Sequence, residues 1–177
     1  MFLAHPKILE SRVWHWPDEA ACAAFAARLA RLPGLADAFI TLQGPLGAGK
    51  TTFVRHLLRC LGVTGRIKSP TYTVMEPYQV AGQPIAHFDF YRFNDPREWE
   101  DAGFREVFAQ PGLKLAEWPD KAAGVLPVPD LALHLSVTSA ENGAAGDLAP
   151  AREVRGDALT PAGQELMKGL GAAGAGS

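Results

Sequence analysis

The sequence predicts an α/β fold of three layers, in which a mostly parallel sheet carries helices on both faces and an antiparallel hairpin forms one edge. Three observations predict this fold class. A glycine-rich turn joins a short apolar run to a segment with helical periodicity. Further short apolar runs follow along the chain, as expected of strands that are buried on both faces. Two extended segments are separated only by Ala81-Gly82-Gln83, which predicts the hairpin.

Size and charge limit what the chain can be. Its 177 residues, 47% of them hydrophobic, fit a single domain over residues 1–170, with residues 171–177 as a disordered tail. The formal net charge of −2 gives no basic field that would hold DNA or RNA by charge alone. Because no apolar run approaches the length of a membrane span and residues 1–7 lack a signal-peptide core, we expect a cytoplasmic protein without membrane contact. Cys22 and Cys60 lack metal-ligand spacing, and we expect both to be small buried hydrophobic residues.

The first elements are a strand and a helix. We expect the strand over Ser11–Trp16, followed by a helix that opens at Pro17-Asp18-Glu19, where proline and acids occupy the first turn. Pro33-Gly34 should end this helix. Its apolar stripe consists of Phe25, Leu29 and Leu32.

Residues 44–52, Gly-Pro-Leu-Gly-Ala-Gly-Lys-Thr-Thr, fit the Walker A template G-x-x-x-x-G-K-[ST]. This motif is meaningful only when a strand enters it and a helix leaves it. The apolar run 38–42 predicts the strand, and Gly62 supplies the stop signal for the helix. The apolar residues at helical spacing are Phe53, Val54, Leu57, Leu58 and Leu61. We therefore interpret residues 44–52 as the phosphate-binding loop (P-loop) of an NTPase domain.

A P-loop binds phosphate because its backbone N–H groups converge on the anionic oxygens and the following helix adds its positive end. Lys50 is expected to reach the β- and γ-phosphates, and Thr51 to offer its hydroxyl to Mg²⁺. The residues expected to contact the nucleotide are Gly44, Gly47, Ala48, Gly49, Lys50, Thr51 and Thr52.

The second half of the chain continues the alternation of strands and helices. We expect extended segments over Tyr72–Val80 and Pro84–Arg92, a short helix from Asp95-Pro96 to about Ala102, strands over Leu113–Trp118 and Leu131–Val137, and a last helix from Thr160-Pro161 toward Leu170.

Two acids end apolar runs and are candidates for the metal site. A P-loop needs such an acid because Mg²⁺ prefers hard oxygen ligands and the phosphates supply only some of them. Asp89 closes the run 85–88, and Glu117 closes the run 113–116. Either carboxylate could face the phosphates, and the alternative for each is a solvated strand end.

Four motifs together resemble the bacterial TsaE family, formerly called YjeE. They are residues 44–52, Lys68–Thr73, His87–Arg92 and Glu117–Pro119, and the matching stretch runs from about residue 11 to residue 135. The resemblance implies an ATPase, with ATP and Mg²⁺ as cofactors, that supports threonylcarbamoyladenosine formation in tRNA. It also implies TsaB and TsaD as partners, with tRNA contacted indirectly through their complex.

The resemblance also implies roles for individual residues. Lys50 would contact the phosphates, Thr51 and Glu117 would bind Mg²⁺, and Asp89 would be the catalytic or water-positioning acid, with Asp89 as the alternative metal ligand. Thr71 and Tyr72 would lie in a segment placed like a GTPase switch, and Trp118 would have a functional role beside Glu117. Glu19 and Arg152 would approach the nucleotide.

Some features depart from the family or leave alternatives open. Many members have an acid where Pro45 stands, and the insert 138–150 is rich in glycine and alanine. We interpret His87 as structural, and Arg92 either as a source of charge for the transition state or as half of a salt bridge within the hairpin. The rival functions are a small-molecule or nucleotide kinase and a non-hydrolysing ATP-binding switch. A GTPase is disfavoured because the chain has no Asn-Lys-x-Asp guanine reader.

Overall fold

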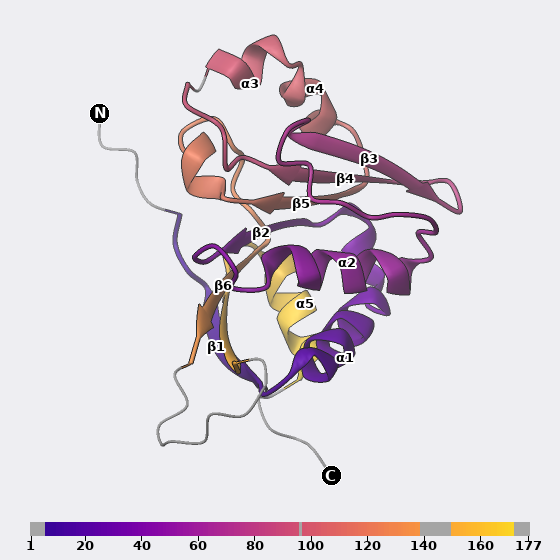
Figure 1. The fold of residues 1–177 in the computed structure, drawn as a ribbon, viewed down its shortest axis with the longest axis vertical. Coiled ribbons are helices and arrows are strands. Elements are labelled where there is room, and N and C mark those ends of the chain that lie inside the picture. Colours follow the sequence, from indigo (N-terminus) through magenta and orange to yellow (C-terminus); the bar gives the residue numbers. More distant parts are fainter. Residues whose placement is uncertain (1–5, 96, 139–149, 172–177) are drawn as a thin grey trace.

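The computed structural model of the chain describes residues 6–95, 97–138 and 150–171 (Figure 1). Only Gly171 of the predicted tail 171–177, and only Thr138 and Pro150 of the insert 138–150, are therefore among the described residues. Within the described ranges, no helix has both the length and the apolar character needed to cross a membrane.

The centre of the fold is one seven-stranded sheet in the order β1-β7-β6-β2-β5-β4-β3. The four central strands β6, β2, β5 and β4 are parallel, as predicted for this α/β fold. The β3–β4 hairpin forms one antiparallel edge, and β7 with β1 forms the other. The strands are β1 (Glu10–Trp16), β2 (Phe39–Gln43), β3 (Met75–Val80), β4 (Gln83–Asp89), β5 (Leu113–Glu117), β6 (Leu131–Val137) and β7 (Arg152–Ala158).

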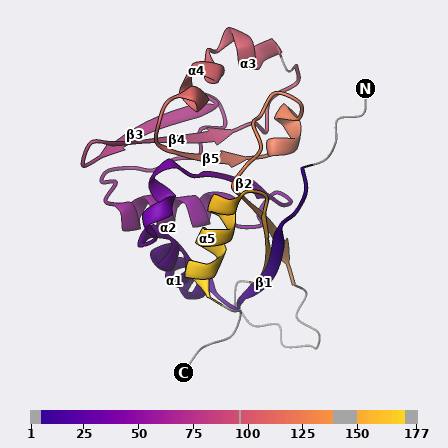
Figure 2. The ribbon, with the colours of Figure 1, turned by 180° about the vertical axis from the view of Figure 1, so that it is seen from behind.

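Helices cover both faces of the sheet, which makes the three layers (Figures 1 and 2). The helices are α1 (Glu19–Ala30), α2 (Lys50–Leu61), α3 (Arg97–Asp101), α4 (Phe104–Ala109) and α5 (Pro161–Leu170), with 3₁₀ turns over Pro33–Asp37 and Pro119–Ala122. The predicted starts of α1 and α5 are confirmed by their caps, whereas α3 begins at Arg97 rather than at Asp95-Pro96. Asp18 accepts a hydrogen bond from the amide of Ala21 at 2.8 Å, and Thr160 accepts one from the amide of Gly163 at 3.1 Å.

Two apolar clusters hold the layers together. The larger one packs α1, α2 and α5 against one face, with Phe25, Phe53 and Leu57 fully buried at its centre. The smaller one packs α3 and α4 against β2, β4 and β5 on the opposite face, with Phe88 and Phe90 fully buried. Edge-to-face aromatic pairs recur in both clusters and fix the orientation of the rings.

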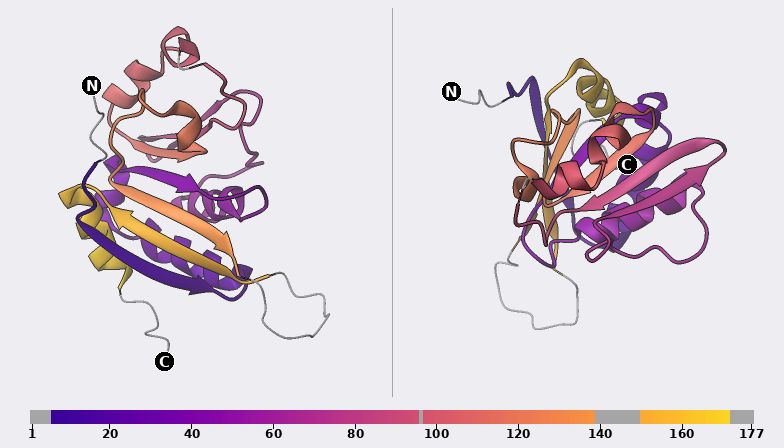
Figure 3. Two further views of the ribbon diagram at one scale, coloured as in Figure 1. Left: turned by 90° about the vertical axis from the view of Figure 1, so that its left-hand side faces the viewer. Right: turned by 90° about the horizontal axis from the view of Figure 1, so that it is seen from above.

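One part of the sheet is left open. Figure 3 shows β1, β7 and β6 without a helix over the face that is opposite α1, α2 and α5. Asp157 lies on this face and is nevertheless buried, because three neighbouring side chains cover its carboxylate. Ser11 donates a hydrogen bond to it at 2.5 Å, and His134 and Arg155 lie 3.1 and 3.2 Å from it. Polar contacts thus replace a covering helix at this position.

Several element boundaries differ from the predictions. The strand β3 begins at Met75 rather than Tyr72, because residues 71–73 form a turn and Val74 has a φ of 65°. The strand β4 ends at Asp89 rather than Arg92, because the chain turns there. The helix α4 and the strand β7 were not predicted. The prediction for Cys60 is wrong, since its side chain is exposed, whereas Cys22 is buried as expected.

Candidate functional site

The P-loop follows β2 and turns sharply into α2. Gly44 has a φ of 149°, and a Cβ there would lie 2.4 Å from the carbonyl oxygen of Leu135 on β6, so no side chain fits. Gly49 has a φ of 103° and stands at the N-cap of α2, a conformation that glycine adopts without strain. The backbone N–H groups of the loop and the N-terminus of α2 therefore lie beside the carboxyl ends of the parallel strands, where α/β folds bind ligands.

Lys50 is folded back onto the P-loop. Its ammonium group donates hydrogen bonds to the carbonyl oxygens of Gly44 at 2.6 Å and Pro45 at 3.0 Å. The indole of Trp118 covers it, with the ammonium nitrogen 4.1 Å from the ring centroid. Burial lowers the pKa of Lys50 below its ordinary value, and the charges of Glu117 and Asp89 partly oppose that shift. The side chain is thus a shielded cation beside the position where phosphate would bind.

The two predicted acids lie side by side. Asp89 and Glu117 are register partners at the carboxyl ends of the parallel strands β4 and β5, and both are buried, with 4% and 2% of their surfaces exposed. The Thr51 hydroxyl donates to the two carboxylate oxygens of Glu117 at 2.9 and 3.1 Å. On the other side, His87 Nε2 lies 2.8 Å from Glu117 Oε1, while His87 Nδ1 has no partner among the described residues. His87, interpreted from the sequence as structural, therefore also orients a predicted site residue.

Asp89 has a different set of partners. Its carboxylate accepts hydrogen bonds from the hydroxyl of Ser69 at 2.6 Å and of Thr71 at 3.3 Å, and from the amide of Tyr91 at 2.9 Å. The loop that carries Ser69 and Thr71 is thereby tied to the end of β4. A change at Asp89 would directly alter the hydrogen bonds that hold this loop.

An open cavity of about 770 Å³, which we call the P-loop pocket, brings most of the predicted residues together. Those that line it are Gly47, Gly49, Lys50, Thr51, Thr52, Thr71, Asp89, Glu117, Trp118 and Arg152. The structure adds Leu46, Ser69 and Tyr91, which the sequence did not single out. Hydroxyl and carboxylate oxygens at Thr51, Glu117 and Asp89 are hard donors that fit Mg²⁺. Within the described residues, no cluster of three or more His, Cys, Asp or Glu side chains could hold a metal by itself.

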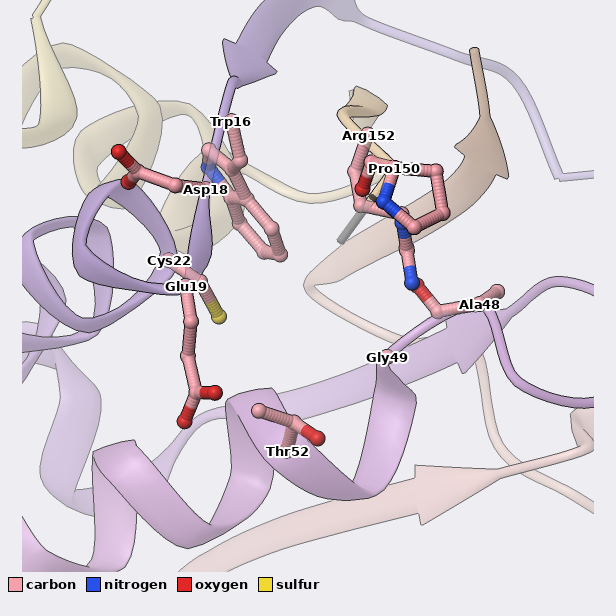
Figure 4. Close-up of a pocket in the computed structure, with 9 residues that line it drawn as sticks. All are labelled: Trp16, Asp18, Glu19, Cys22, Ala48, Gly49, Thr52, Pro150 and Arg152. Atoms are coloured by element: carbon pink, nitrogen blue, oxygen red, sulfur yellow. Dashed lines mark hydrogen bonds between the residues drawn. The ribbon is translucent and has the colours of Figure 1, made fainter. Parts of the chain in front are cut away.

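A second cavity of about 470 Å³, the Trp16 pocket, adjoins the first (Figure 4). It is lined by Trp16, Asp18, Glu19, Cys22, Ala48, Gly49, Thr52, Pro150 and Arg152. In Figure 4 the ring of Trp16 and the sulfur of Cys22 point into the cavity. Burial, reinforced by the charge of Glu19, raises the pKa of the Cys22 thiol to about 12.

The polar rim of the Trp16 pocket contains two predicted residues. Glu19 lies 2.9 Å from Nε2 of His56 on α2. Arg152 donates from Nε to the carbonyl oxygen of Ala48 at 2.8 Å and from Nη2 to that of Gly47 at 3.2 Å. Glu19 and Arg152, which lie far apart in the sequence, thus reach the same cavity.

The predicted switch residues divide between two surfaces. Thr71 and Trp118 line the P-loop pocket, but Tyr72 does not and is 84% exposed. The guanidinium carbon of Arg92 lies 4.4 Å from the centroid of the Tyr72 ring. Arg92 does not line the P-loop pocket, and among the described residues no carboxylate lies within 4.0 Å of it. Neither of the two roles considered for Arg92 matches this position.

Two residues that line the pockets were not singled out from the sequence. Trp16 lies in the cavity because β1 pairs with β7, which makes Trp16 the register partner of Arg152. Periodicity alone cannot reveal such a pairing between strands at opposite ends of a chain. Ser69 could have been found, because it lies inside the motif Lys68–Thr73 and its hydroxyl is a candidate partner for a buried acid.

Comparison with known proteins gives a consistent result. The sequence model of a family described as threonylcarbamoyl adenosine biosynthesis protein TsaE matches residues 16–145. The tRNA threonylcarbamoyladenosine biosynthesis protein TsaE of Haemophilus influenzae is 40% identical over 131 residues, which cover 72% of this chain and 83% of that protein. The protein of the same name from Bacillus subtilis is 44% identical over 79 residues, which cover 45% of this chain and 49% of that protein.

The fold is similar to a solved structure as well. The crystal structure of Bacillus subtilis YdiB superposes with a TM-score of 0.68 over 93% of this chain and 96% of that one, at 25% sequence identity. The likeness thus extends over almost the whole length of both chains.

Proposed function

The chain belongs to the TsaE family of threonylcarbamoyladenosine biosynthesis proteins, and from that premise we propose that it is a Mg²⁺-dependent ATPase that supports this tRNA modification. Its fold is a nucleotide-binding P-loop fold, and its pathway is tRNA processing. The observation that carries the proposal is the convergence of Lys50, Thr51, Asp89 and Glu117 on one pocket. These groups are the ones that phosphoryl transfer to water needs: a cation, metal ligands and an acid that positions water.

Binding of ATP requires an exchange of hydrogen bonds in the P-loop pocket. The Lys50 ammonium would leave the carbonyl oxygens of Gly44 and Pro45 for the β- and γ-phosphate oxygens, which are stronger acceptors. The Thr51 hydroxyl would turn from Glu117 toward the metal. When bound, Mg²⁺ would supply positive charge to the phosphates. Glu117, whose carboxylate is oriented by His87, would be the second protein ligand of the metal.

Asp89 is assigned the positioning of the attacking water. Its carboxylate is held by Ser69, Thr71 and the amide of Tyr91, so its orientation is set before substrate arrives. A carboxylate oxygen near the γ-phosphate can orient water and accept its proton as the bond forms. Because His87 orients Glu117 while Ser69, Thr71 and Tyr91 hold Asp89, we assign the two acids separate tasks.

The Trp16 pocket would hold the nucleoside part of ATP. It offers an aromatic wall at Trp16, a carboxylate at Glu19 and a guanidinium at Arg152, and it shares Gly49, Thr52 and Arg152 with the P-loop pocket. A base needs an apolar slot with a few polar groups to fix its orientation, and this cavity supplies both. The specific recognition of adenine is part of the same proposal.

TsaB and TsaD are the proposed partners, and tRNA would be reached through their complex. Thr71 and Trp118 line the P-loop pocket, and Tyr72 stands beside them on the surface, so a partner that touches this region could sense the nucleotide. We further propose a cytoplasmic protein whose residues 1–170 act as one domain.

A non-hydrolysing ATP switch is the second candidate, and it is favoured by one observation. Ser69 and Thr71 in the loop before β3 are bonded to Asp89 in the P-loop pocket, so nucleotide binding alone could move this loop without turnover. Phosphate release separates the candidates when it is measured with the chain alone, with the TsaB–TsaD pair, and with a panel of small acceptors. Release of phosphate to water is expected, with the largest rate when the pair is present. Transfer to an acceptor would make the protein a kinase, and binding without release would make it a switch.

A further inference from the structure

A third cavity, of about 710 Å³, lies outside the two pockets on the loop between α2 and β3. This loop crosses the right-hand side of Figure 1, from the end of α2 to the start of the hairpin. Residues that line the cavity include Arg66, Lys68, Ser69, Tyr72, Glu76 and Tyr78. We call Arg66, Lys68 and Tyr72 of this lining, together with Arg92, which does not line the cavity but lies over the Tyr72 ring, the basic surface.

The basic surface carries cations without partners. Arg66, Lys68 and Arg92 are exposed, and within the described ranges no carboxylate lies within 4.0 Å of any of them. Glu76 is the one acid in the cavity's lining. Arg59 is a positioning residue here, because its guanidinium donates to the carbonyl oxygens of Val63, at 2.9 Å, and Gly65, and so fixes the turn that precedes Arg66. A chain with a net charge of −2 thus concentrates positive charge at this place.

An aromatic ring stands within the same surface. Tyr72 is 84% exposed although the guanidinium of Arg92 lies over its ring at 4.4 Å from the centroid. The Tyr72 ring is therefore accessible to a ligand and is not part of either apolar cluster. A ring with an arginine on one face is a platform on which an unstacked base can stack.

The cavity at the basic surface shares a lining residue with the P-loop pocket. Ser69 lines both cavities, and its hydroxyl donates to Asp89 at 2.6 Å. Thr71, one residue before Tyr72, donates to the same carboxylate at 3.3 Å. A ligand that moves Tyr72 or Lys68 would therefore act on the bonds that hold Asp89.

We propose that the basic surface binds single-stranded RNA, with phosphates on Arg66 and Lys68 and a base on the ring of Tyr72. Exposed cations interleaved with an aromatic ring match the chemistry of a single strand, in which phosphates and unstacked bases are both accessible. The family acts in the modification of tRNA, which contains single-stranded loops. The overall charge keeps the affinity low, so this contact adds to the binding of partners and does not replace it. The proposal does not depend on ATP hydrolysis.

The test is fluorescence anisotropy with a labelled single-stranded oligoribonucleotide of about 12 nucleotides, a length within the usual site size. At low salt, the full chain should bind it and should bind the matched RNA duplex at least about fivefold more weakly. Arg66→Ala and Lys68→Ala should each weaken binding about 3- to 10-fold and reduce the salt slope by about one. Tyr72→Ala should weaken it by about fivefold or more, while Tyr72→Phe, which keeps the ring, should change it little.

Arg105→Ala is the control for overall charge, because it removes one positive charge from α4, outside the lining of this cavity, where Arg105 lies 3.3 Å from Glu100. Circular dichroism of each variant verifies that it is folded. If Arg105→Ala weakens RNA binding as much as Arg66→Ala or Lys68→Ala does, the effect comes from overall charge and the proposal is wrong. Absence of RNA binding together with binding of polyglutamate would overturn it in favour of an acidic protein partner. Phosphate release by Arg66→Ala, a residue that does not line the P-loop pocket, should be unchanged in the absence of RNA, which separates this proposal from the ATPase proposal.

Discussion

The P-loop pocket and the Trp16 pocket share Gly49, Thr52 and Arg152, yet different interactions build them. In the P-loop pocket, charged and hydroxyl groups bond to one another: Lys50 to loop carbonyls, and Thr51 to Glu117. The wall of the Trp16 pocket is held by aromatic packing and by the pairing of β1 with β7. A ligand must exchange bonds in the first pocket, whereas it meets a preformed surface in the second. Substitutions in the first should therefore alter chemistry and spare the fold, and those in the second should alter both.

Trp16→Ala should give the largest effect on stability. The indole stacks on Phe53 with centroids 5.7 Å apart and contacts Phe25 at 5.2 Å, so its loss leaves a cavity in the larger apolar cluster. We expect the free energy of unfolding to fall by about 3–5 kcal/mol. Urea unfolding measures it, and Trp16→Phe is the control that should recover most of the loss. A variant as stable as the wild type would show that packing does not hold this pocket.

Lys50→Ala should affect chemistry and spare the fold. We expect phosphate release to fall by about 10²–10³-fold, because a preorganised cation that contacts the developing charge is removed. Stability should change little, since the ammonium's burial costs free energy that its hydrogen bonds only offset. Phosphate release and thermal unfolding are measured on the same preparation. Full turnover by the folded variant would remove the P-loop from the mechanism.

Glu117→Gln and Asp89→Asn should separate the tasks of the two acids. Glu117→Gln replaces a charged ligand by a neutral one, so the Mg²⁺ concentration for half-maximal activity should rise by about tenfold or more. Asp89→Asn should lower turnover by about 10–100-fold with nucleotide affinity nearly preserved. Titration of activity with Mg²⁺, beside binding of a fluorescent ATP analogue, distinguishes them. If the metal requirement shifts only for Asp89→Asn, the two roles are reversed.

Binding to the TsaB–TsaD pair should depend on the nucleotide state. An ATP analogue and ADP should give affinities for the pair that differ by about fivefold or more, and the pair should change nucleotide affinity by the same factor. Calorimetry of the chain with the pair, with each nucleotide and with neither, measures both sides of the linkage. Trp118→Ala should reduce the difference, because Trp118 covers the cation that phosphate attracts. Equal affinities in all states would show that the P-loop pocket does not communicate with partners.

Cysteine alkylation gives the smallest effect and tests the Trp16 pocket alone. Cys22 is buried and its pKa is raised to about 12, so at pH 8 almost none of it is the reactive thiolate, whereas Cys60 is exposed. Iodoacetamide should label Cys60 first, and ATP should slow the labelling of Cys22 further without changing Cys60. Peptide mass spectrometry resolves the two sites. Equal protection of both, or of neither, would argue against a ligand in the Trp16 pocket.

The sequence predicts the P-loop pocket far better than the Trp16 pocket. The Walker A motif and the acids at strand ends are local patterns, and the structure brings Lys50, Asp89 and Glu117 together as expected. The strand β7 has only a weak signal of this kind: Arg155 and Asp157 alternate with Val154, Gly156 and Ala158, of which only Val154 is a large apolar residue. Without β7 the position of Trp16 could not be derived. The turn at residues 71–73 was missed because its partner, Asp89, is distant in sequence.

The pairing of β1 with β7 has a consequence for synthesis on the ribosome. The edge strand β1 is made first, and its single neighbour in the sheet is β7, which is made last among the strands. Contacts between such distant segments form late, because the intervening chain must be ordered first. A nascent chain can thus form its P-loop before the strand that pairs with β1 has been synthesised. The Trp16 pocket is complete only after Arg152 has been added, so an unfinished chain has the P-loop but lacks the complete Trp16 pocket.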